Sequence, residues 1–297
     1  MLAVVAVVVL LARTGREATP HVLAVPGQPA GIVTTPGRVW VATQGSGAIR
    51  VFDSASGAPV GAPLHTGGTP ARLAVGATGV WAADTANGAV IPARWRPRRR
   101  VFRPITVGAD VTDVALSARA VWVASAAEGV VRAIEAGPRR RITKLHVGAN
   151  PVALAANERW VVAAVAGSGT VARIDARTRR VAGPPVRVGG VPVAVALAGD
   201  RAWVADARGS VTGVDLGAGA VAGPPVSLGG EPVALAADGD DVYVLCRSDR
   251  VLVHVDMARG EVRSRRSVGG EPTAVAVDAE HVWVTLAAED QVVRLDR

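Results

Sequence analysis

The sequence repeats one phrase at intervals of 40 or 41 residues, and this repetition constrains the fold more than any other feature. Its last copy covers residues 272–296, PTAVAVDAEHVWVTLAAEDQVVRLD, and contains three short apolar runs separated by small, polar or acidic residues. Each run has the length and the β-branched or aromatic composition of a strand. Seven copies start at one shared anchor position, which holds Pro29, Pro70, Val111, Pro151, Pro192, Pro232 and Pro272.

Each copy predicts four strands, because further markers recur at fixed distances from the anchor. The second strand carries an aromatic residue in six copies, namely Trp40, Trp81, Trp122, Trp203, Tyr243 and Trp283. The fourth copy has Val162 at that position and Trp160 two residues earlier. The fourth strand contains Pro-Pro in two copies, at 184–185 and 224–225. Since proline cannot donate to a strand ladder, the fourth strand must be an exposed edge.

Seven four-stranded units of about 40 residues are the signature of a β-propeller. We therefore predict an all-β fold, a seven-bladed β-propeller of four-stranded antiparallel blades over residues 20–297. The seventh copy stops at Arg297, after its third strand, whereas residues 21–29, HVLAVPGQP, resemble the end of a fourth strand. The N-terminal strand is therefore expected to complete the last blade, which removes the open edge of the ring.

Residues 1–19 lie outside the repeat and are predicted to be a hydrophobic anchor or signal-like segment with a linker. Residues 1–12 are wholly apolar, but twelve helical residues span only about 18 Å of a hydrocarbon layer about 30 Å thick. A secretory signal would begin with a basic region, which is missing here. The segment is either the end of a longer transmembrane helix or a degenerate signal. Both alternatives place the propeller outside the cytoplasm, in the cell envelope or anchored to the membrane by its N-terminus.

Several kinds of chemistry find no support in the composition. Cys246 is the only cysteine, which excludes an internal disulfide and a cysteine-based metal site. The five histidines lack metal-ligand spacing, so we expect no metal, no cofactor and no catalytic residue. The formal net charge of +8 comes almost entirely from arginine, with Lys144 the single lysine. Basic stretches lack interleaved aromatics apart from Trp95 and Phe102, so no nucleic-acid partner is expected.

The charges are expected to separate onto the two ends of the ring. Loops that enter the first strand of a blade share one end, the mouth face, with the loops between second and third strands. We predict a ligand-binding channel mouth there, formed by Arg72, Asp84, Asp110, Asp113, Asp206, Glu231 and Glu271. The other end, the rim face, is predicted to carry a basic rim of Arg98, Arg99, Arg100, Arg139, Arg140, Arg141, Arg179, Arg180, Arg265 and Arg266. This rim either faces an anionic membrane surface or only keeps the turns soluble.

Arg72 and Asp113 are the most unusual of these positions. Both stand two residues after an anchor in adjacent copies, where the other copies have glycine or alanine. Two opposite charges near a narrow channel are either a local ion pair or part of a ligand site, because an unpaired buried charge is costly.

Repeats such as residues 229–245, GGEPVALAADGDDVYVL, and residues 269–296 resemble those of the YVTN and NHL class of bacterial propellers. The chain also has a distant resemblance to the streptogramin (virginiamycin B) lyases and the propeller lactonases. The lyase repeats commonly read P-H-G after the turn and end their second strand in W-F-T-E. Here the residue after the anchor is never histidine, and the position of that glutamate holds Thr43, Asp84, Ser125, Val165, Asp206, Cys246 or Leu286.

Three functions follow from these resemblances and residues. The first is a non-enzymatic extracytoplasmic module, monomeric and membrane-associated, that binds a protein or small-molecule ligand; some actinobacterial Ser/Thr kinases carry similar propellers as outer sensor domains. The second is an enzyme resembling the streptogramin lyases or lactonases, with a metal-dependent site at the channel mouth. The third is a plain structural scaffold.

Overall fold

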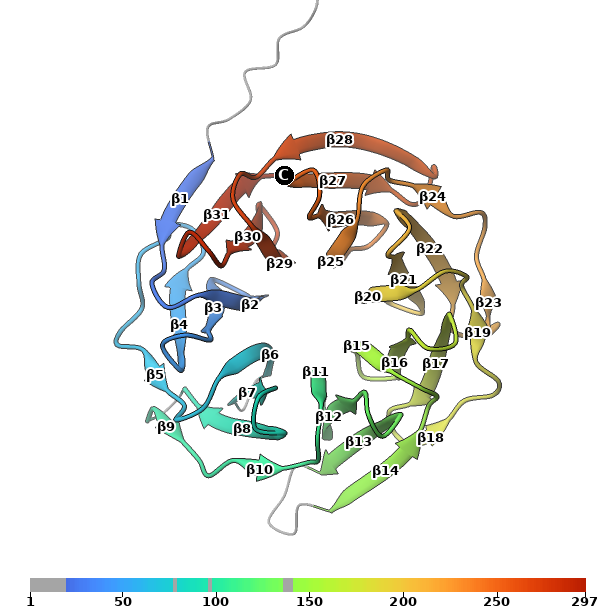
Figure 1. Ribbon diagram of the computed structural model, residues 1–297, viewed down its shortest axis with the longest axis horizontal. Coiled ribbons are helices and arrows are strands. Elements are labelled where there is room, and N and C mark those ends of the chain that lie inside the picture. The colour runs from blue at the N-terminus through green and yellow to red at the C-terminus, as the bar shows by residue number, and fades with distance from the viewer. Residues whose placement is uncertain (1–19, 77–78, 96–97, 136–140) are drawn as a thin grey trace, which may run out of the picture.

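The computed structural model describes residues 20–76, 79–95, 98–135 and 141–297, which form seven antiparallel sheets around a central axis (Figure 1). Each sheet is one blade, numbered 1 to 7 from the sheet that begins at Pro29, and the predicted seven-bladed propeller is confirmed. Within the described ranges, no helix is long and apolar enough to cross a membrane.

The inner strands of the blades surround the central channel, and six of the seven begin at the prolines of the repeat. In order of the blades they are β2 (Pro29–Thr35), β6 (Pro70–Gly76), β11 (Val111–Ser117), β15 (Pro151–Ala156), β20 (Pro192–Ala198), β25 (Pro232–Asp238) and β29 (Pro272–Val277). In each, the ladder with the second strand shifts register between the anchor and the second residue after it. This β-bulge turns the start of the strand at the mouth of the channel.

The second and third strands form the buried middle of each blade. The second strands are β3 (Arg38–Thr43), β7 (Gly79–Asp84), β12 (Ala120–Ser125), β16 (Trp160–Val165), β21 (Arg201–Asp206), β26 (Asp241–Cys246) and β30 (His281–Leu286). The third strands are β4 (Ala48–Asp53), β8 (Ala89–Arg94), β13 (Val130–Glu135), β17 (Thr170–Asp175), β22 (Ser210–Asp215), β27 (Val251–Asp256) and β31 (Gln291–Asp296). Both faces of these strands pack against neighbouring blades, which explains why they are almost continuously apolar.

The outer strands are the exposed edges of the blades, and several are interrupted. They are β1 (His21–Ala24), β5 (Leu64–His65), β9 (Arg100–Val101), β10 (Ile105–Thr106), β14 (Ile142–His146), β18 (Arg180–Val181), β19 (Val186–Arg187), β23 (Ala220–Val221), β24 (Val226–Ser227) and β28 (Glu261–Ser267). In blade 4 the prolines at 184–185 separate β18 from β19, and both short strands pair with β17. The same break separates β23 from β24 in blade 5, as expected where proline interrupts an edge ladder.

The repeated tryptophans fill the spaces between blades. Trp122, Trp203 and Trp283 are fully buried, and Trp122 packs among residues of blades 3 and 4. Their indole N–H groups find acceptors at the rim face, for example the Ser117 hydroxyl at 3.0 Å from Trp122 Nε1. A buried indole needs such a partner, so the tryptophans are structural residues of the blade interfaces.

The N-terminal strand closes the ring, as the sequence predicted. Strand β1 pairs antiparallel with β31, with His21 opposite Arg294 and Ala24 opposite Gln291. Beyond the strand, the Val25 amide donates to the Asp290 carbonyl at 2.7 Å. The Val25 side chain is fully buried in a cluster that joins blades 7 and 1. Blade 7 therefore has four strands only because the two ends of the described chain meet in one sheet.

Asp290 adds a second connection at the closure. It has a φ of 55° and occupies the turn position at which four other blades have a glycine, Gly47, Gly88, Gly129 and Gly169. Its Oδ1 accepts the amides of Gly27 at 3.1 Å and Gln28 at 2.7 Å, immediately after the closing strand. Because Asp290 stands where these blades have glycine, its carboxylate can bind the chain between the closing strand β1 and β2.

Deletion of residues 1–26 is expected to destabilise the whole ring. It removes the β1 ladder, the buried side chain of Val25 and the partly buried side chain of Leu23, worth about 3 kcal/mol of apolar burial together. We expect the melting temperature to fall by roughly 5–10 °C. Deletion of residues 1–12 is the control and leaves the melting temperature unchanged, since the ladder starts at His21. Equal melting of both truncated proteins by circular dichroism would refute the closure.

Replacing Asp290 separates its carboxylate from its backbone conformation. Asp290→Ala leaves two amides without an acceptor. It also places alanine, which lacks the polar side-chain atoms that help Asp and Asn adopt a positive φ, at a positive φ. We therefore expect a loss of about 1–3 kcal/mol in unfolding free energy. Asp290→Asn keeps one acceptor oxygen and tolerates positive φ, and is expected to lose less than half of that. Chemical denaturation of both variants measures the difference. Equal losses would show that the carboxylate does not hold the closing strand.

Candidate functional site

The central channel is a narrow cavity of about 190 Å³ lined by residues of all seven inner strands. Most of its lining is Val, Leu, Ile and Ala, and its polar side chains are Arg72, Asp113 and Thr273. Both charged residues predicted from the repeat therefore do face one cavity. The volume is below the range of about 300–1,000 Å³ that is usual for small-molecule sites.

Arg72 and Asp113 lie on adjacent blades but reach in opposite directions. Arg72 Nη1 donates to the Ala30 carbonyl of blade 1 at 3.2 Å. The Asp113 carboxylate accepts the Leu154 amide of blade 4 and the Val114 amide of its own strand, each at 2.8 Å. No contact within 4.0 Å joins the guanidinium to the carboxylate among the described side chains. In place of the predicted direct ion pair, each side chain forms its own hydrogen bonds to backbone groups.

These bonds belong to a wider set that joins neighbouring inner strands. The Thr112 hydroxyl donates to the Pro151 carbonyl at 2.8 Å, and the Thr273 hydroxyl donates to the Pro29 carbonyl at 3.1 Å. Burial raises the pKa of Asp113, while Arg72 and the two amide donors act in the opposite direction. The net shift is upward because the carboxylate lies deep in the ring, although channel solvent still reaches part of the residue.

Two other carboxylates of the predicted mouth are buried and cap turns. Asp84 is 2% exposed, and its Oδ1 accepts the Thr69 hydroxyl at 2.8 Å and the Asn87 amide at 3.2 Å. Burial raises the pKa of Asp84, but these hydrogen bonds outweigh it and hold the pKa below its ordinary value. Asp206 is 6% exposed and accepts the Arg208 amide at 2.5 Å. Both side chains therefore fix the loops between second and third strands.

The remaining three predicted carboxylates, Asp110, Glu231 and Glu271, are exposed at the mouth. Each directly precedes an inner strand, so the topology places them around the channel opening. Their backbones are held in place; for example, the Glu271 amide donates to Glu289 Oε2 at 3.1 Å. Within the described chain, none of the three side-chain carboxylates has a hydrogen bond or an ion pair.

The predicted basic rim is distributed differently from the expectation. Arg265 and Arg266 lie on the outer strand β28 and bind the carbonyls of Leu228 and Asp296. Arg179 forms an ion pair with Glu135, and Arg180 lies on the outer strand β18. Arg141 is exposed beside β14, whereas Arg139 and Arg140 lie outside the described residues.

Blade 2 carries three consecutive exposed arginines of the predicted rim. Arg99 lies 4.0 Å above the ring of Trp95 and donates to the Ala62 carbonyl at 3.1 Å. Arg100 lies 5.1 Å from the centre of Phe102, and Arg98 is exposed. Both aromatic residues that the sequence singled out thus support arginines. A guanidinium over an aromatic face keeps its N–H groups available at the edge.

Carboxylates at the ends of the third strands share the rim face with the arginines. Asp53 pairs with Arg38 at 2.8 Å, and Asp256 pairs with Arg263 at 2.5 Å. Hydrogen bonds from Arg263 lower the pKa of Asp256. The rim face is therefore mixed in charge over much of the ring, and blade 2, whose third strand ends in Arg94, is the exception.

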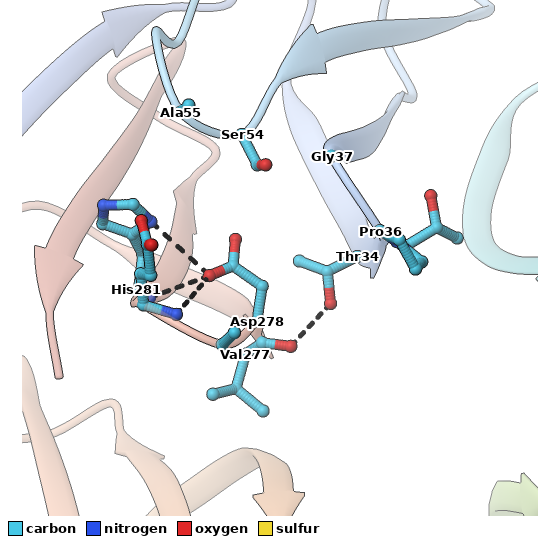
Figure 2. A pocket seen from close by; sticks show the side chains of 11 residues that line it. Thr34, Pro36, Gly37, Ser54, Ala55, Val277, Asp278 and His281 are labelled. Atoms are coloured by element: carbon cyan, nitrogen blue, oxygen red, sulfur yellow. Dashed lines mark hydrogen bonds and ion pairs between the residues drawn. The ribbon is translucent and has the colours of Figure 1, made fainter.

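A cleft that the sequence did not predict lies on the rim face between blades 1 and 7 (Figure 2). Its volume is about 500 Å³, and its walls are residues 34–37 and 54–55 of blade 1 and residues 277–281 of blade 7. Asp278 is at its centre, where its carboxylate accepts the amides of Glu280 and His281 and the Trp283 indole. Only the Pro36-Gly37 turn, which has no polar side chain, hinted at an opening here.

The other candidate chemistry has little support in the geometry. Among the described residues, no group of three or more His, Cys, Asp or Glu side chains is arranged to hold a metal ion. Cys246 is fully buried, and burial together with the nearby Asp249 raises the pKa of its thiol to about 11. Such a thiol is a packing residue, since the thiolate is the reactive form.

Comparison with known proteins defines the fold. No family model and no curated protein matches the chain. Among solved structures, the virginiamycin B lyase of Staphylococcus aureus is similar with a TM-score of 0.79 at 13% identity, covering 94% of this chain and 99% of that one. The Kuenenia stuttgartiensis hydrazine synthase is similar with a TM-score of 0.75 at 17% identity, covering 97% of this chain and 99% of that one. The structure of U3-55K is similar with a TM-score of 0.79 at 14% identity, covering 95% of this chain and 99% of that one.

These three structures have different names but similar folds. The sequence identity of each to this chain is below 20%. A shared fold at such identity does not transfer an activity. The chain is therefore a β-propeller similar in structure to the virginiamycin and streptogramin B lyases, and its resemblance to YVTN and NHL repeats stays a prediction.

Proposed function

We propose that this protein is a non-enzymatic, extracytoplasmic binding module that presents its mouth face to a positively charged partner. The observation that carries the proposal is the set of three exposed carboxylates, Asp110, Glu231 and Glu271, around the channel opening. Exposed charges without a structural partner are free to pair with a ligand, and they favour a partner of opposite sign. Arg208 and Arg247 lie on the same face, in loops between second and third strands. A positively charged partner is therefore attracted only to the loops that enter the inner strands.

The channel itself supports a scaffold better than an active site. Its two charged side chains are engaged by the backbones of neighbouring blades, and its lining includes no histidine, serine or cysteine. General acid–base catalysis needs a group that can exchange a proton with a substrate within hydrogen-bond reach. Asp113 already accepts two backbone amides, which favour its ionised form over proton uptake.

The position of the N-terminus supports a membrane-associated arrangement. Strand β1 runs antiparallel to β31, which ends at the rim face, so the chain enters the ring at that face near Pro20. If residues 1–19 hold the protein at a membrane, the rim face is turned toward the lipid and the mouth face away from it. A partner outside the cell would then meet the three mouth carboxylates first.

The mouth is tested by removing its free charges. The triple variant Asp110→Asn, Glu231→Gln, Glu271→Gln is expected to bind an oligoarginine probe about tenfold more weakly at low salt, because each exposed ion pair contributes about 0.2–1 kcal/mol. The control triple variant Glu158→Gln, Glu261→Gln, Asp296→Asn removes the same number of charges elsewhere and keeps the affinity. Biolayer interferometry at two salt concentrations measures both. Equal losses in the two variants would reduce the effect to net charge and sink the proposal.

The absence of lyase activity is tested directly with quinupristin, the compound in one structure of an inactive variant of the Staphylococcus aureus lyase. The protein is incubated with quinupristin and divalent cations, and mass spectrometry follows any conversion. We expect a rate equal to that of buffer, while the S. aureus lyase serves as positive control. Conversion that disappears in an Asp113→Ala variant would instead establish an enzyme with its site in the channel.

A further inference from the structure

The cleft between blades 1 and 7 lies at a junction whose rim-face turns are joined differently from those of two other junctions. Between blades 4 and 5, Trp160 Nε1 donates across to Asp200 Oδ1 at 2.8 Å, and Arg159 pairs with the same carboxylate at 2.8 Å. Between blades 5 and 6, Trp203 Nε1 donates to the Gly239 carbonyl at 3.0 Å, and Arg201 pairs with Asp240 at 3.3 Å. These contacts join the turns of neighbouring blades at the rim face.

Among the described residues, the junction of blades 7 and 1 lacks both of these contacts. Trp283 Nε1 donates to Asp278 Oδ2 within its own blade at 2.8 Å, and Trp40 and Trp122 likewise donate within their own blades. The facing turn of blade 1, Pro36-Gly37, offers no carboxylate to an arginine. The turns are linked below the surface by the Thr34 hydroxyl, which donates to the Val277 carbonyl at 2.6 Å. The space above this bond stays open, and Figure 2 shows Thr34 and Asp278 beside it.

The lining of the cleft contains no Lys or Arg, but His281 Nδ1 lies 3.5 Å from Asp278 Oδ1 and Arg297 donates to the Asp278 carbonyl at 3.1 Å. Asp278 stays ionised, because hydrogen bonds from Trp283, Glu280 and His281 outweigh its burial and lower its pKa. Glu280 is exposed at the edge, and the Ser54 hydroxyl makes no hydrogen bond within the described chain. Two carboxylates on one wall attract a cation, whereas the hydroxyl on the opposite wall suits a hydroxylated compound.

The remaining walls are small and apolar. Pro36 and Ala55 come from blade 1, and Val277 and Ala279 come from blade 7. Such surfaces pack against the carbon skeleton of a ligand while the polar groups fix its orientation. A volume of about 500 Å³ lies within the usual range for a small-molecule site and leaves room for one sugar-sized molecule.

We propose that this cleft binds a small hydroxylated amine of the amino-sugar class, with its ammonium group toward Asp278 and Glu280. The site is independent of the mouth, since the two lie at opposite ends of the ring. A bound molecule contacts blade 1 and blade 7 together, so it connects the first and the last blade. Because it binds the closed ring and not the unfolded chain, it raises the melting temperature.

Glucosamine and glucose are the probes, since they differ mainly by the ammonium group. Binding to the full chain is measured by saturation-transfer NMR and calorimetry at low salt. Glucosamine is expected to bind at least about fivefold more tightly than glucose, as expected for one ion pair at a partly exposed site. Glucosamine also raises the melting temperature. Absence of glucosamine binding, or equal affinity for the two sugars, overturns the proposal.

Two variants locate the site. Glu280→Gln is expected to weaken glucosamine binding about threefold. Ala279→Trp fills the cleft and is expected to abolish binding. Glu261→Gln, an exposed carboxylate on the outer strand β28, is the matched control and leaves the affinity unchanged. The melting temperature of each variant without sugar verifies folding. Unchanged binding in folded Ala279→Trp, or an equal loss in Glu261→Gln, would place the sugar elsewhere and refute the cleft.

Discussion

Every blade of this ring depends on one pairing, the four residues of β1 against β31. Blades 1 to 6 each take their strands from one continuous stretch, whereas blade 7 takes its outer strand from the opposite end of the described chain. The closing segment is held by the ladder, by the buried Val25 side chain and by the Asp290 carboxylate. These contacts join residues more than 260 positions apart, so they carry a large loop-closure cost in folding. Once formed, they leave no open edge between the first and last blades.

The closed ring uses most of its charged side chains to hold itself together, which narrows where a ligand can bind. In the channel, Arg72 and Asp113 bind backbone groups of neighbouring blades. At the mouth, Asp84 and Asp206 cap turns, and at the rim the carboxylates at the strand ends pair with arginines. A charge engaged in this way is already partly compensated, so it attracts a ligand less strongly than a free charge does. The proposed binding at the mouth therefore rests on the free groups, Asp110, Glu231 and Glu271.

The sequence predicted the features that the repeat determines. It did not predict the features that depend on contacts at a single junction between two blades. Anchor spacing gave the number of blades, and the pattern of residues 21–29 indicated the closure. The spacing also placed Arg72 and Asp113 on adjacent inner strands, but the direction in which each side chain reaches depends on the carbonyl or amide exposed by the next blade. Likewise, the predicted basic rim did not include the acidic residues at the ends of the third strands. Asp53 and Asp256, for example, lie on the same face and pair with arginines.

The junction between blades 7 and 1 combines the strand pairing that closes the ring with the cleft of about 500 Å³ between its rim-face turns. The strand pairing at the outside of blade 7 makes a bridge between the rim-face turns unnecessary for closure. The turn of blade 1, Pro36-Gly37, has no acidic residue that could form such a bridge. A molecule in the cleft would add its binding free energy to the closed state, by an amount that grows with the logarithm of its concentration. Because closure by the N-terminal strand brings the two walls of the cleft together, a molecule bound to both walls would stabilise the closed ring.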